Sequence, residues 1–199
     1  MNEFDIGIKE KDFVLDVGCW GGARVSKLSS ICNNVYGIDI NTERFKLADK
    51  ETRKRLFFGD VEKGIPLKMK FDWIFLTEVL EHLKNDKLAL KNISKSLKKN
   101  GKLILTTTKS IRFFEFYDPA WIRWKFGGER HYHYTKEELF KKLEKNNLVV
   151  NEYSLKGNLI WVIIRWINVF LRYVLRLKFQ INIKTGKGFC QWIILAKRK

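Results

Sequence analysis

The sequence predicts an α/β fold whose centre is a doubly wound, mostly parallel sheet. Short apolar runs of strand length alternate with stretches of helical pattern along the first half of the chain. A glycine-rich corner, FVLDVGCWGG at residues 13–22, joins the first run to the first helical stretch. Because parallel strands end at one edge of a sheet, we expect a ligand site beyond that edge. Polar residues stand at or just beyond the ends of these runs, at Asp16, Asp39, Asp60, Glu78 and Thr107.

The apolar runs define five parallel strands, predicted at residues 13–17, 35–39, 56–58, 71–76 and 102–107. Helices are predicted between them, at residues 23–31, 42–54 and 86–98, with a helical turn at residues 79–83. Residue types that cap helix N-termini precede the second and third helices, at Asn41 or Thr42 and at Asn85 or Asp86. Asn100-Gly101 is expected to end the third helix, as a C-cap does.

The second half of the chain adds two strands and two irregular segments. Residues 108–134 are rich in aromatic and charged side chains, lack a clean period and are predicted to form a lid. Thr135 and Glu138 form a capping box that begins a helix ending near residue 145. Further strands are predicted at residues 148–155 and 189–197.

Length and composition indicate a single domain, residues 1–199, in a reducing compartment. Of the 199 residues 45% are hydrophobic, which is enough for one core. The cysteines Cys19, Cys32 and Cys190 have neither metal-ligand nor disulfide spacing. With only three histidines as well, no metal site is predicted. The amino terminus shows no secretory pattern, so we expect a cytoplasmic protein.

Positive charge is concentrated toward the carboxyl terminus. The net charge is +17, and residues 151–199 hold 10 basic side chains against one acidic, Glu152. A field of that sign favours polyanionic partners such as anionic lipid, nucleic acid or phosphorylated substrates. For residues 1–150 we favour a compositional explanation, in which a Lys-rich sequence reflects genome bias or a thermophilic lifestyle.

The glycine corner also carries a family resemblance. The pattern Asp16-x-Gly18-x-x-x-Gly22 resembles the first motif of the class I S-adenosylmethionine-dependent methyltransferases, with Trp20 where that motif commonly has glycine. Further motifs follow in order, so that the resemblance covers residues 11–153 and is to the type 11-like small-molecule domains. It implies a Rossmann-like, seven-stranded sheet with an antiparallel last strand, and S-adenosylmethionine as the cofactor.

Asp39 ends the second strand, 21 residues after Gly18. A carboxylate at this position can accept hydrogen bonds from ribose hydroxyls, as in dinucleotide-binding proteins, but the G-x-G-x-x-G spacing of those proteins is absent. The resemblance implies that Asp16 helps to hold the methionine ammonium group, that Gly18 and Gly22 give backbone room, and that Asp60 accepts from the adenine amino group. The other cofactor contacts assigned through it are Cys19, Trp20, Ile40, Val61, Thr77 and Glu78.

His82 is the first of three candidate catalytic residues. It lies in TEVLEHL, residues 77–83, which resembles the segment after the fourth strand of small-molecule methyltransferases. The Asn/Asp-Pro-Pro-aromatic motif of nucleic-acid amino methyltransferases does not occur there. A histidine can serve as a base near neutral pH, although a packing role beside the cofactor is the favoured alternative. The neighbouring Glu81 is expected to be solvated.

His131 and His133 are the other two candidates. They lie in GGERHYHY, residues 127–134, between the lid and the next helix. If this segment is extended, alternation puts both histidines on one side and Tyr132 and Tyr134 on the other. The alternatives are one residue facing the acceptor and a simple edge strand.

An apolar insertion, residues 158–178, separates the last two strands. Its longest uncharged run is too short to span a bilayer. On a helix, its polar residues fall within an arc of about 80°, at Arg165, Asn168, Arg172 and Arg176. The segment either lies on an anionic membrane with its arginines at the headgroups, or packs on the sheet edge or a second subunit with its arginines in water. Nucleic acid is the third choice of partner.

These features predict methyl transfer from S-adenosylmethionine to an O or N nucleophile of a small or lipid-linked acceptor. We expect residues 158–178 to contact a membrane surface, with a homodimer interface as the alternative. Two other functions stay open at this stage: an RNA methyltransferase, and a catalytically silent nucleotide-binding membrane adaptor.

Overall fold

A seven-stranded sheet forms the centre of the computed structural model, which describes residues 7–177, 179–181 and 187–199. The strand order is β3-β2-β1-β4-β5-β7-β6; β7 is antiparallel to both of its neighbours, and β1 to β5 run parallel. The sheet is therefore the doubly wound, mostly parallel sheet with an antiparallel last strand that the sequence predicts. The strands are β1 Phe13–Val17, β2 Asn34–Asp39, β3 Leu56–Phe58, β4 Phe71–Thr77, β5 Leu97–Thr108, β6 Leu148–Lys156 and β7 Gln191–Arg198.

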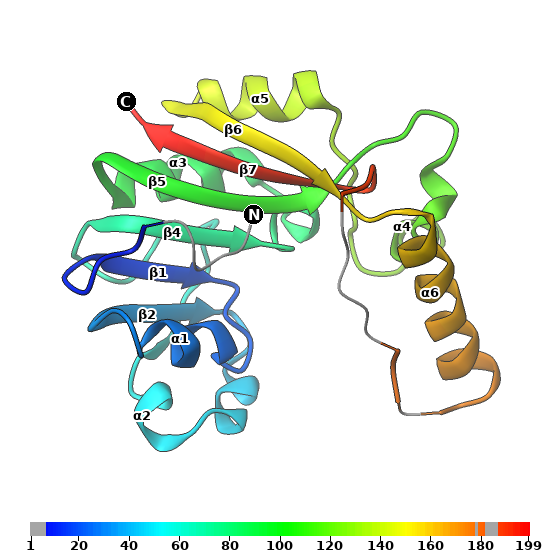
Figure 1. Ribbon diagram of the computed structural model, residues 1–199, viewed down its shortest axis with the longest axis horizontal. Helices are drawn as coiled ribbons and strands as arrows, with labels where there is room; N and C mark the ends of the chain where they lie inside the picture. The colour runs from blue at the N-terminus through cyan, green and yellow to red at the C-terminus, as the bar shows by residue number, and fades with distance from the viewer. Residues whose placement is uncertain (1–6, 178, 182–186) are drawn as a thin grey trace.

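Helices connect these strands and lie on both faces of the sheet (Figure 1). The α-helices are α1 Ala23–Leu28, α2 Lys50–Arg53, α3 Asp86–Ser96, α4 Pro119–Lys125, α5 Lys136–Glu144 and α6 Leu159–Val169. Short 3₁₀ turns are η1 Thr42–Leu47, η2 Leu80–His82 and η3 Glu115–Tyr117, and η4, Phe170–Val174, is a π-helical turn.

Alternating side chains of the central strands build two apolar cores. Ile74 and Leu76 of β4 belong to a core that also contains buried residues of α3 and α5. Trp73 and Phe75 point to the other face and belong to a core with buried residues of α1. A strand places successive side chains on opposite faces of the sheet. Strands that are covered on both faces therefore have near-continuous apolar sequences, as these strands do.

The helix predicted at residues 42–54 is broken into two pieces. The 3₁₀ turn η1 ends before Ala48, whose ψ of 149° is extended, and α2 begins afresh at Lys50. Asp49 causes the restart, since its carboxylate accepts hydrogen bonds from the backbone N–H groups of Glu51 and Thr52 at 3.0 and 2.9 Å. A second N-cap residue, Asp49, thus divides the predicted helix into a 3₁₀ turn and a short α-helix.

The sequence predicts that Asn100-Gly101 ends the third helix, but both residues lie within a strand instead. Helix α3 stops at Ser96, and β5 begins at Leu97 and contains both residues. The pairing of β4 with β5 shifts between Phe71 and Trp73, and Asn100 takes a left-handed φ of 66°. The pair therefore forms an irregularity in a strand, where its tolerance of positive φ is used in the same way as at a helix end. Asn85 is the N-cap of α3, with its side-chain oxygen 3.1 Å from the Leu88 nitrogen.

The segment predicted as a lid lies beyond the carboxyl ends of the parallel strands and holds η3 and α4 (Figure 1). Its far end returns to the sheet, because the Tyr134 nitrogen donates to the Thr108 carbonyl at 3.1 Å. Helix α6 stands beside α4 at the same edge. The lid, α6 and the residues just before β7 share a small apolar cluster that includes Tyr117, Val162 and Cys190.

The apolar insertion forms a shorter helix than residues 158–178. Asn158 caps α6, η4 continues it to Val174, and Arg176 lies beyond the helix with a positive φ of 54°; residue 178 is outside the described part of the chain. Arg176 therefore does not share a helical face with Arg165. Of the described helices, none has the length and apolar character needed to cross a bilayer.

Candidate active site

The glycine corner after β1 adopts the tight turn that its sequence predicts. Gly18 has φ 73°, and its nitrogen and that of Cys19 both donate to the Ile38 carbonyl of β2, at 2.8 and 3.1 Å. A Cβ atom on Gly18 would lie 2.3 Å from a methyl carbon of Val79, so only glycine fits. The corner thus packs directly against the segment that follows β4, and Gly22 begins α1 at φ 77°.

Asp39 links the corner to the end of β2. One carboxylate oxygen accepts from the Trp20 nitrogen and the other from the Asn41 nitrogen, each at 2.8 Å. Asp39 is half-buried, and an ionised carboxylate has about four acceptor positions, so each oxygen keeps capacity for a further donor. The carboxylate is therefore fixed in place and remains able to accept from a pair of hydroxyl groups.

Asp16 is buried at the base of the corner and pairs with Arg24 of α1, whose guanidinium nitrogen lies 2.6 Å from its carboxylate. The negative charge that the resemblance assigns to an ammonium group is thus already compensated within the protein. Cys19 is also buried, and burial together with the charges of Asp16 and Asp39 raises the pKa of its thiol to about 12. Cys19 therefore contributes an uncharged, unreactive surface.

Two apolar side chains are exposed on either side of Asp39. Trp20 is 57% and Ile40 69% exposed, which is unusual for residues this large. Trp20 has a left-handed φ of 51°, and the Arg44 guanidinium lies 4.0 Å from the centre of its ring. Exposed apolar side chains thus lie close to the Asp39 carboxylate, where they could contact a nucleobase.

Asp60 and Val61 lie one strand further along the same edge. One Asp60 oxygen accepts from the Glu62 nitrogen at 3.0 Å, and the other lies 3.5 Å from the Lys63 ammonium. These are contacts of a turn-forming aspartate. Val61 is buried in the core shared with α3, and presents no side chain for a polar contact.

Thr77 and Glu78 end β4. Thr77 is half-buried, whereas Glu78 is exposed and has a positive φ of 55°. The Glu78 carboxylate accepts from the Thr106 hydroxyl at 2.7 Å and from the Gln191 amide at 2.8 Å, which brings β4, β5 and β7 together at their shared edge. A strained backbone held by three strands is typical of a functional edge.

Glu81 is fully buried, so the expectation that it is solvated was wrong. One of its carboxylate oxygens accepts from the Thr107 hydroxyl at 2.8 Å, and its backbone carbonyl accepts from the Tyr132 nitrogen at 2.9 Å. Burial, with the negative charge of Glu78 nearby, raises the pKa of Glu81 well above its usual value. Burial beneath the lid therefore favours the protonated, uncharged form of this carboxyl group.

His82 is half-buried, and its Nδ1 lies 2.8 Å from the Arg130 carbonyl oxygen. Because a carbonyl only accepts, Nδ1 carries the proton and Nε2 is left as the acceptor. Burial lowers the pKa of His82, so the ring is neutral at physiological pH. Its ring centre lies 4.9 Å from that of His131.

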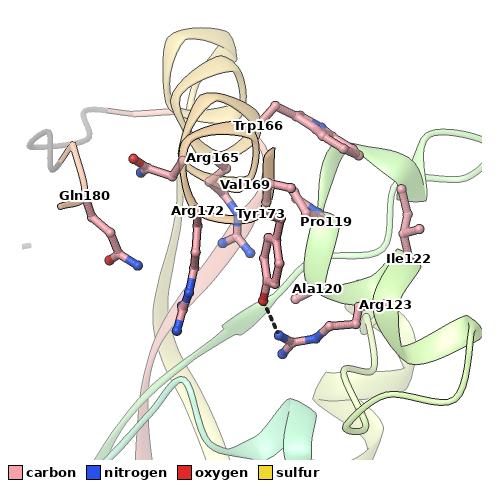
Figure 2. Close-up of a pocket in the computed structure, with 11 residues that line it drawn as sticks. Pro119, Ala120, Ile122, Arg123, Arg165, Trp166, Val169, Arg172, Tyr173 and Gln180 are labelled. Carbon is pink, nitrogen blue, oxygen red and sulfur yellow. Dashed lines mark hydrogen bonds between the residues drawn. The ribbon is translucent and has the colours of Figure 1, made fainter. Parts of the chain in front are cut away.

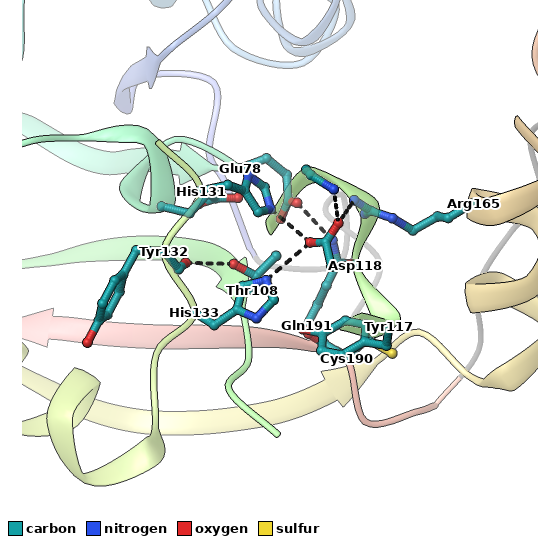
Figure 3. A network of polar contacts seen from close by, with 12 residues as sticks. Glu78, Thr108, Tyr117, Asp118, His131, Tyr132, His133, Arg165, Cys190 and Gln191 are labelled. Atoms are coloured by element: carbon teal, nitrogen blue, oxygen red, sulfur yellow. Dashed lines mark hydrogen bonds and ion pairs between the residues drawn. The ribbon is translucent and has the colours of Figure 1, made fainter. Parts of the chain in front are cut away.

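His131 and His133 point to one side of their extended segment, as alternation predicts, and meet at Asp118 (Figure 3). The Nε2 atoms of His131 and His133 lie 2.8 and 3.3 Å from the same Asp118 oxygen, and Nδ1 of His133 contacts Glu115. The other side of the segment holds Tyr132 and Tyr134, whose rings are 4.8 Å apart.

Asp118 and Arg165 belong to this network but were not among the residues predicted from the sequence. Asp118 is the N-cap of α4 and is fully buried, and its second oxygen pairs with Arg165 of α6. Burial alone would raise the pKa of Asp118, but hydrogen bonds from His131 and His133 and the charge of Arg165 lower it well below its usual value. Arg165 thus faces inward, so the expectation that all the arginines of the insertion point to headgroups or water was wrong.

A cavity of about 570 Å³ lies between α4 and α6 (Figure 2). Its walls are apolar and aromatic, from residues such as Ile122, Trp166 and Val169, and three arginines, Arg123, Arg165 and Arg172, also line it. None of the described lining residues is acidic. Because Arg165 lines the cavity and also holds Asp118, the cavity adjoins the histidine network.

Sequence and structure comparisons match this chain to methyltransferases. Residues 15–105 match the model of a methyltransferase domain family. The fold matches the crystal structure of the magnesium protoporphyrin IX methyltransferase of Synechocystis, with bound S-adenosylhomocysteine, at a TM-score of 0.64 and 16% identity, over 98% of this chain and 78% of that one. Residues 15–105 are therefore similar to a methyltransferase domain, and the sheet has the Rossmann-like methyltransferase fold.

Curated relatives are similar to this chain over only part of their length. An uncharacterised protein of Methanocaldococcus jannaschii is 37% identical over 117 residues, which are 58% of this chain and 42% of that protein. A ubiquinone biosynthesis O-methyltransferase of Pelagibacter ubique is 31% identical over 108 residues, 52% of this chain and 45% of that protein. The chain thus matches less than half the length of either relative.

Asp39 at the glycine corner fits the nucleoside part of S-adenosylmethionine. The Gly18 turn packs closely against Val79, and Asp39 is fixed with acceptor capacity to spare. Asp16 fits less directly, because Arg24 already pairs with it. Of the residues predicted to contact the cofactor, Asp39 has the geometry that best fits the prediction, and its ribose contact stays a prediction.

Proposed function

We propose that this chain transfers a methyl group from S-adenosylmethionine to an O or N nucleophile of a small or lipid-linked acceptor. The observation that carries the proposal is the meeting of two groups at one sheet edge. The Gly18 corner with Asp39 packs against the segment after β4, and that segment carries Glu81 and His82 to the lid. A nucleoside-binding surface and a buried set of proton-exchanging groups thus lie on adjacent loops.

The bound cofactor supplies a methyl group on a positively charged sulfur, which is a good leaving group. What this chain must add is alignment of the acceptor, exclusion of water and, for a hydroxyl or ammonium acceptor, removal of a proton. Alignment alone is worth roughly 7–11 kcal/mol of the barrier in well-oriented reactions. The lid supplies the water exclusion, since it covers the ends of β4 and β5 and buries Glu81, His131 and His133.

The cavity between α4 and α6 supports an amphiphilic, anionic acceptor. It combines apolar walls with three arginines and lies next to the histidine network. Several curated relatives are named ubiquinone biosynthesis O-methyltransferases, which fits an acceptor with an apolar chain. The family resemblance and the cavity chemistry thus favour a lipid-linked acceptor over a soluble metabolite.

The exposed side of α6 supports contact with a membrane surface. Large apolar residues there are exposed by about 40–60%, among them Leu159, Ile160, Ile163, Trp166 and Phe170. Contiguous exposed apolar surface marks an interaction site, and basic side chains beside it favour anionic lipid. The exposed apolar residues and nearby arginines thus support the proposal of a peripheral protein at the cytoplasmic face of an anionic membrane.

Titration calorimetry with S-adenosylhomocysteine tests the cofactor site. We expect binding to the unsubstituted protein and a loss of about 10- to 100-fold for Asp39→Ala, because hydrogen bonds to a charged acceptor contribute about 1.5–3 kcal/mol. Asp72→Ala is the matched control, since Asp72 is a carboxylate at the start of β4, at the opposite edge of the sheet. No heat from the unsubstituted protein would refute the function and leave the silent adaptor.

Vesicle flotation tests the membrane contact. Replacing Ile160, Ile163 and Phe170 together by Ser should weaken binding to anionic vesicles about a hundredfold, because each is about half exposed and a fully buried side chain is worth about 1.5–3 kcal/mol. Leu88→Ser with Val149→Ser, both exposed but remote, should change nothing. If neither form floats and the triple variant loses a dimer, α6 is a subunit interface.

Release of bound RNA by rising salt would instead favour the RNA methyltransferase.

A further inference from the structure

Two buried polar atoms have no hydrogen-bond partner among the described residues: Oε1 of Glu81 and Nδ1 of His131. The two atoms lie on neighbouring backbone segments. The Glu81 carbonyl accepts a hydrogen bond from the Tyr132 nitrogen, and the centre of the His82 ring is 4.9 Å from that of the His131 ring. Buried polar groups are nearly always paired in folded proteins. An unpaired carboxyl oxygen and an unpaired ring nitrogen under one lid indicate where a polar group of a ligand binds.

The hydrogen bonds of His131 fix which nitrogen carries its proton. Nε2 lies 2.8 Å from an Asp118 oxygen, and an ionised carboxylate only accepts, so Nε2 holds the hydrogen. Nδ1 is then the nitrogen with a lone pair. His82 has the opposite tautomer, with the proton on Nδ1 facing the Arg130 carbonyl. Of the three histidines, His131 alone presents a buried, unpaired acceptor nitrogen.

Asp118 is held from every side, so the ring of His131 is held as well. Oδ1 of Asp118 contacts Arg165 and accepts from the Ala120 nitrogen at 2.9 Å, and Oδ2 of Asp118 contacts both histidines. His133 bridges Asp118 and Glu115 through its two ring nitrogens, which holds the second histidine of the network in place as well.

The direct contacts within this cluster argue against a metal ion. Asp118, His131 and His133 each offer one ligand atom, and these atoms lie within 4.8 Å of one another. A divalent cation there would lie beside the Arg165 guanidinium, which already pairs with Asp118. The 2.8 Å separation of His131 Nε2 from Asp118 is that of a direct charge-assisted hydrogen bond.

We propose that His131 is the base of the methyl transfer, accepting the acceptor's proton at Nδ1, and that Asp118 and Arg165 are its positioning residues. The proposal rests on the proposed function. In the step, the proton of an acceptor O–H moves to Nδ1 and an oxygen electron pair forms the new bond to the methyl carbon. The carbon–sulfur pair stays on sulfur, and the imidazolium later releases its proton to solvent. Arg165 makes the insertion helix part of the acceptor site.

Nitrogen NMR of the histidine-labelled protein tests the proposal directly, because the chain has only three histidines. His82→Gln and His133→Gln assign the ring signals by difference, and His131 keeps its Asp118 partner in both variants. In the unsubstituted protein we expect His131 as the Nε2–H tautomer, and Asp118→Asn should mix its tautomers. Catechol, added with S-adenosylhomocysteine as a phenolic probe, should shift Nδ1 of His131 more than any other ring nitrogen.

The outcomes separate this proposal from the function on which it rests. A protonated Nδ1 in the free protein, no catechol response, or a response confined to His82 would overturn the base assignment. A change in the His131 and His133 signals on adding EDTA would show a bound metal and also overturn it. Failure of S-adenosylhomocysteine to bind refutes the proposed function instead. His131→Gln should keep its affinity for S-adenosylhomocysteine while losing the catechol response.

Discussion

The pair formed by Asp118 and Arg165 gives a quantitative test of the network beneath the lid. Asp118 is fully buried, and the Arg165 side chain is 26% exposed. Removing one partner of a fully buried pair costs about 3–5 kcal/mol. Because Arg165 reaches solvent and Asp118 keeps both histidines as partners, we expect Arg165→Met to lower the free energy of unfolding by about 1–3 kcal/mol.

A double-mutant cycle with Asp118→Asn isolates the interaction. Urea unfolding of the four proteins should give a coupling energy of about 1–2 kcal/mol, whereas the exposed pair of Glu51 and Lys54 should give a value near zero. The folded-state pKa of Asp118 is lowered, so its stabilisation is present above the unfolded pKa of about 4 and is lost as the pH falls through the folded value. In Arg165→Met this acid loss should begin at higher pH. A coupling energy near zero would refute the inward placement of Arg165.

Three further predictions concern the corner and its neighbours. Gly18→Ala should cost about 2–4 kcal/mol more than Gly127→Ala, since both have positive φ but only Gly18 has Val79 within reach of a Cβ; thermal unfolding at equal buffer compares them. Glu81→Gln should gain stability relative to the unsubstituted protein as the pH rises above about 4, by at most about 1.4 kcal/mol per pH unit. The reason is that the folded pKa of Glu81 is raised, so the unsubstituted protein ionises this group on unfolding and the variant does not. A pH-independent difference in stability would contradict the burial of Glu81 as a neutral acid. Thiol labelling at pH 8 should leave Cys19 unmodified in the folded protein, given a pKa of about 12, and modify it in urea; rapid labelling of the folded state would contradict this.

Local sequence patterns were enough to predict the sheet and the corner. Gly18 and Asp39 could be placed because each depends on its own strand end, and parallel strands bring such ends together without further information. The break at Asp49 was missed because a capping residue inside a helical period competes with the period itself. Strand order and the antiparallel β7 followed from the family resemblance rather than from the residues alone.

The residues of the lid network could not be predicted in the same way. Asp118 and Arg165 are 47 positions apart and meet only because α4 and α6 pack at the same sheet edge. An arginine on an apolar helix looks solvent-facing until a buried carboxylate is known to lie opposite it. Glu81 gave the same difficulty, since its burial depends on Thr107 of β5 and on the lid above it. An aspartate directly before Pro119 was the one available signal, because that pair begins a helix with a fixed carboxylate.

The most direct test of the central claim is transfer of label from methyl-labelled S-adenosylmethionine. The protein would be incubated with anionic vesicles containing a total lipid extract and, in parallel, with an aqueous metabolite extract. We expect label in the lipid phase, with a loss of at least tenfold for Asp39→Ala and no loss for Asp72→Ala. Label confined to the aqueous phase would contradict the lipid-linked acceptor, and no label in either phase would contradict the methyltransferase function itself.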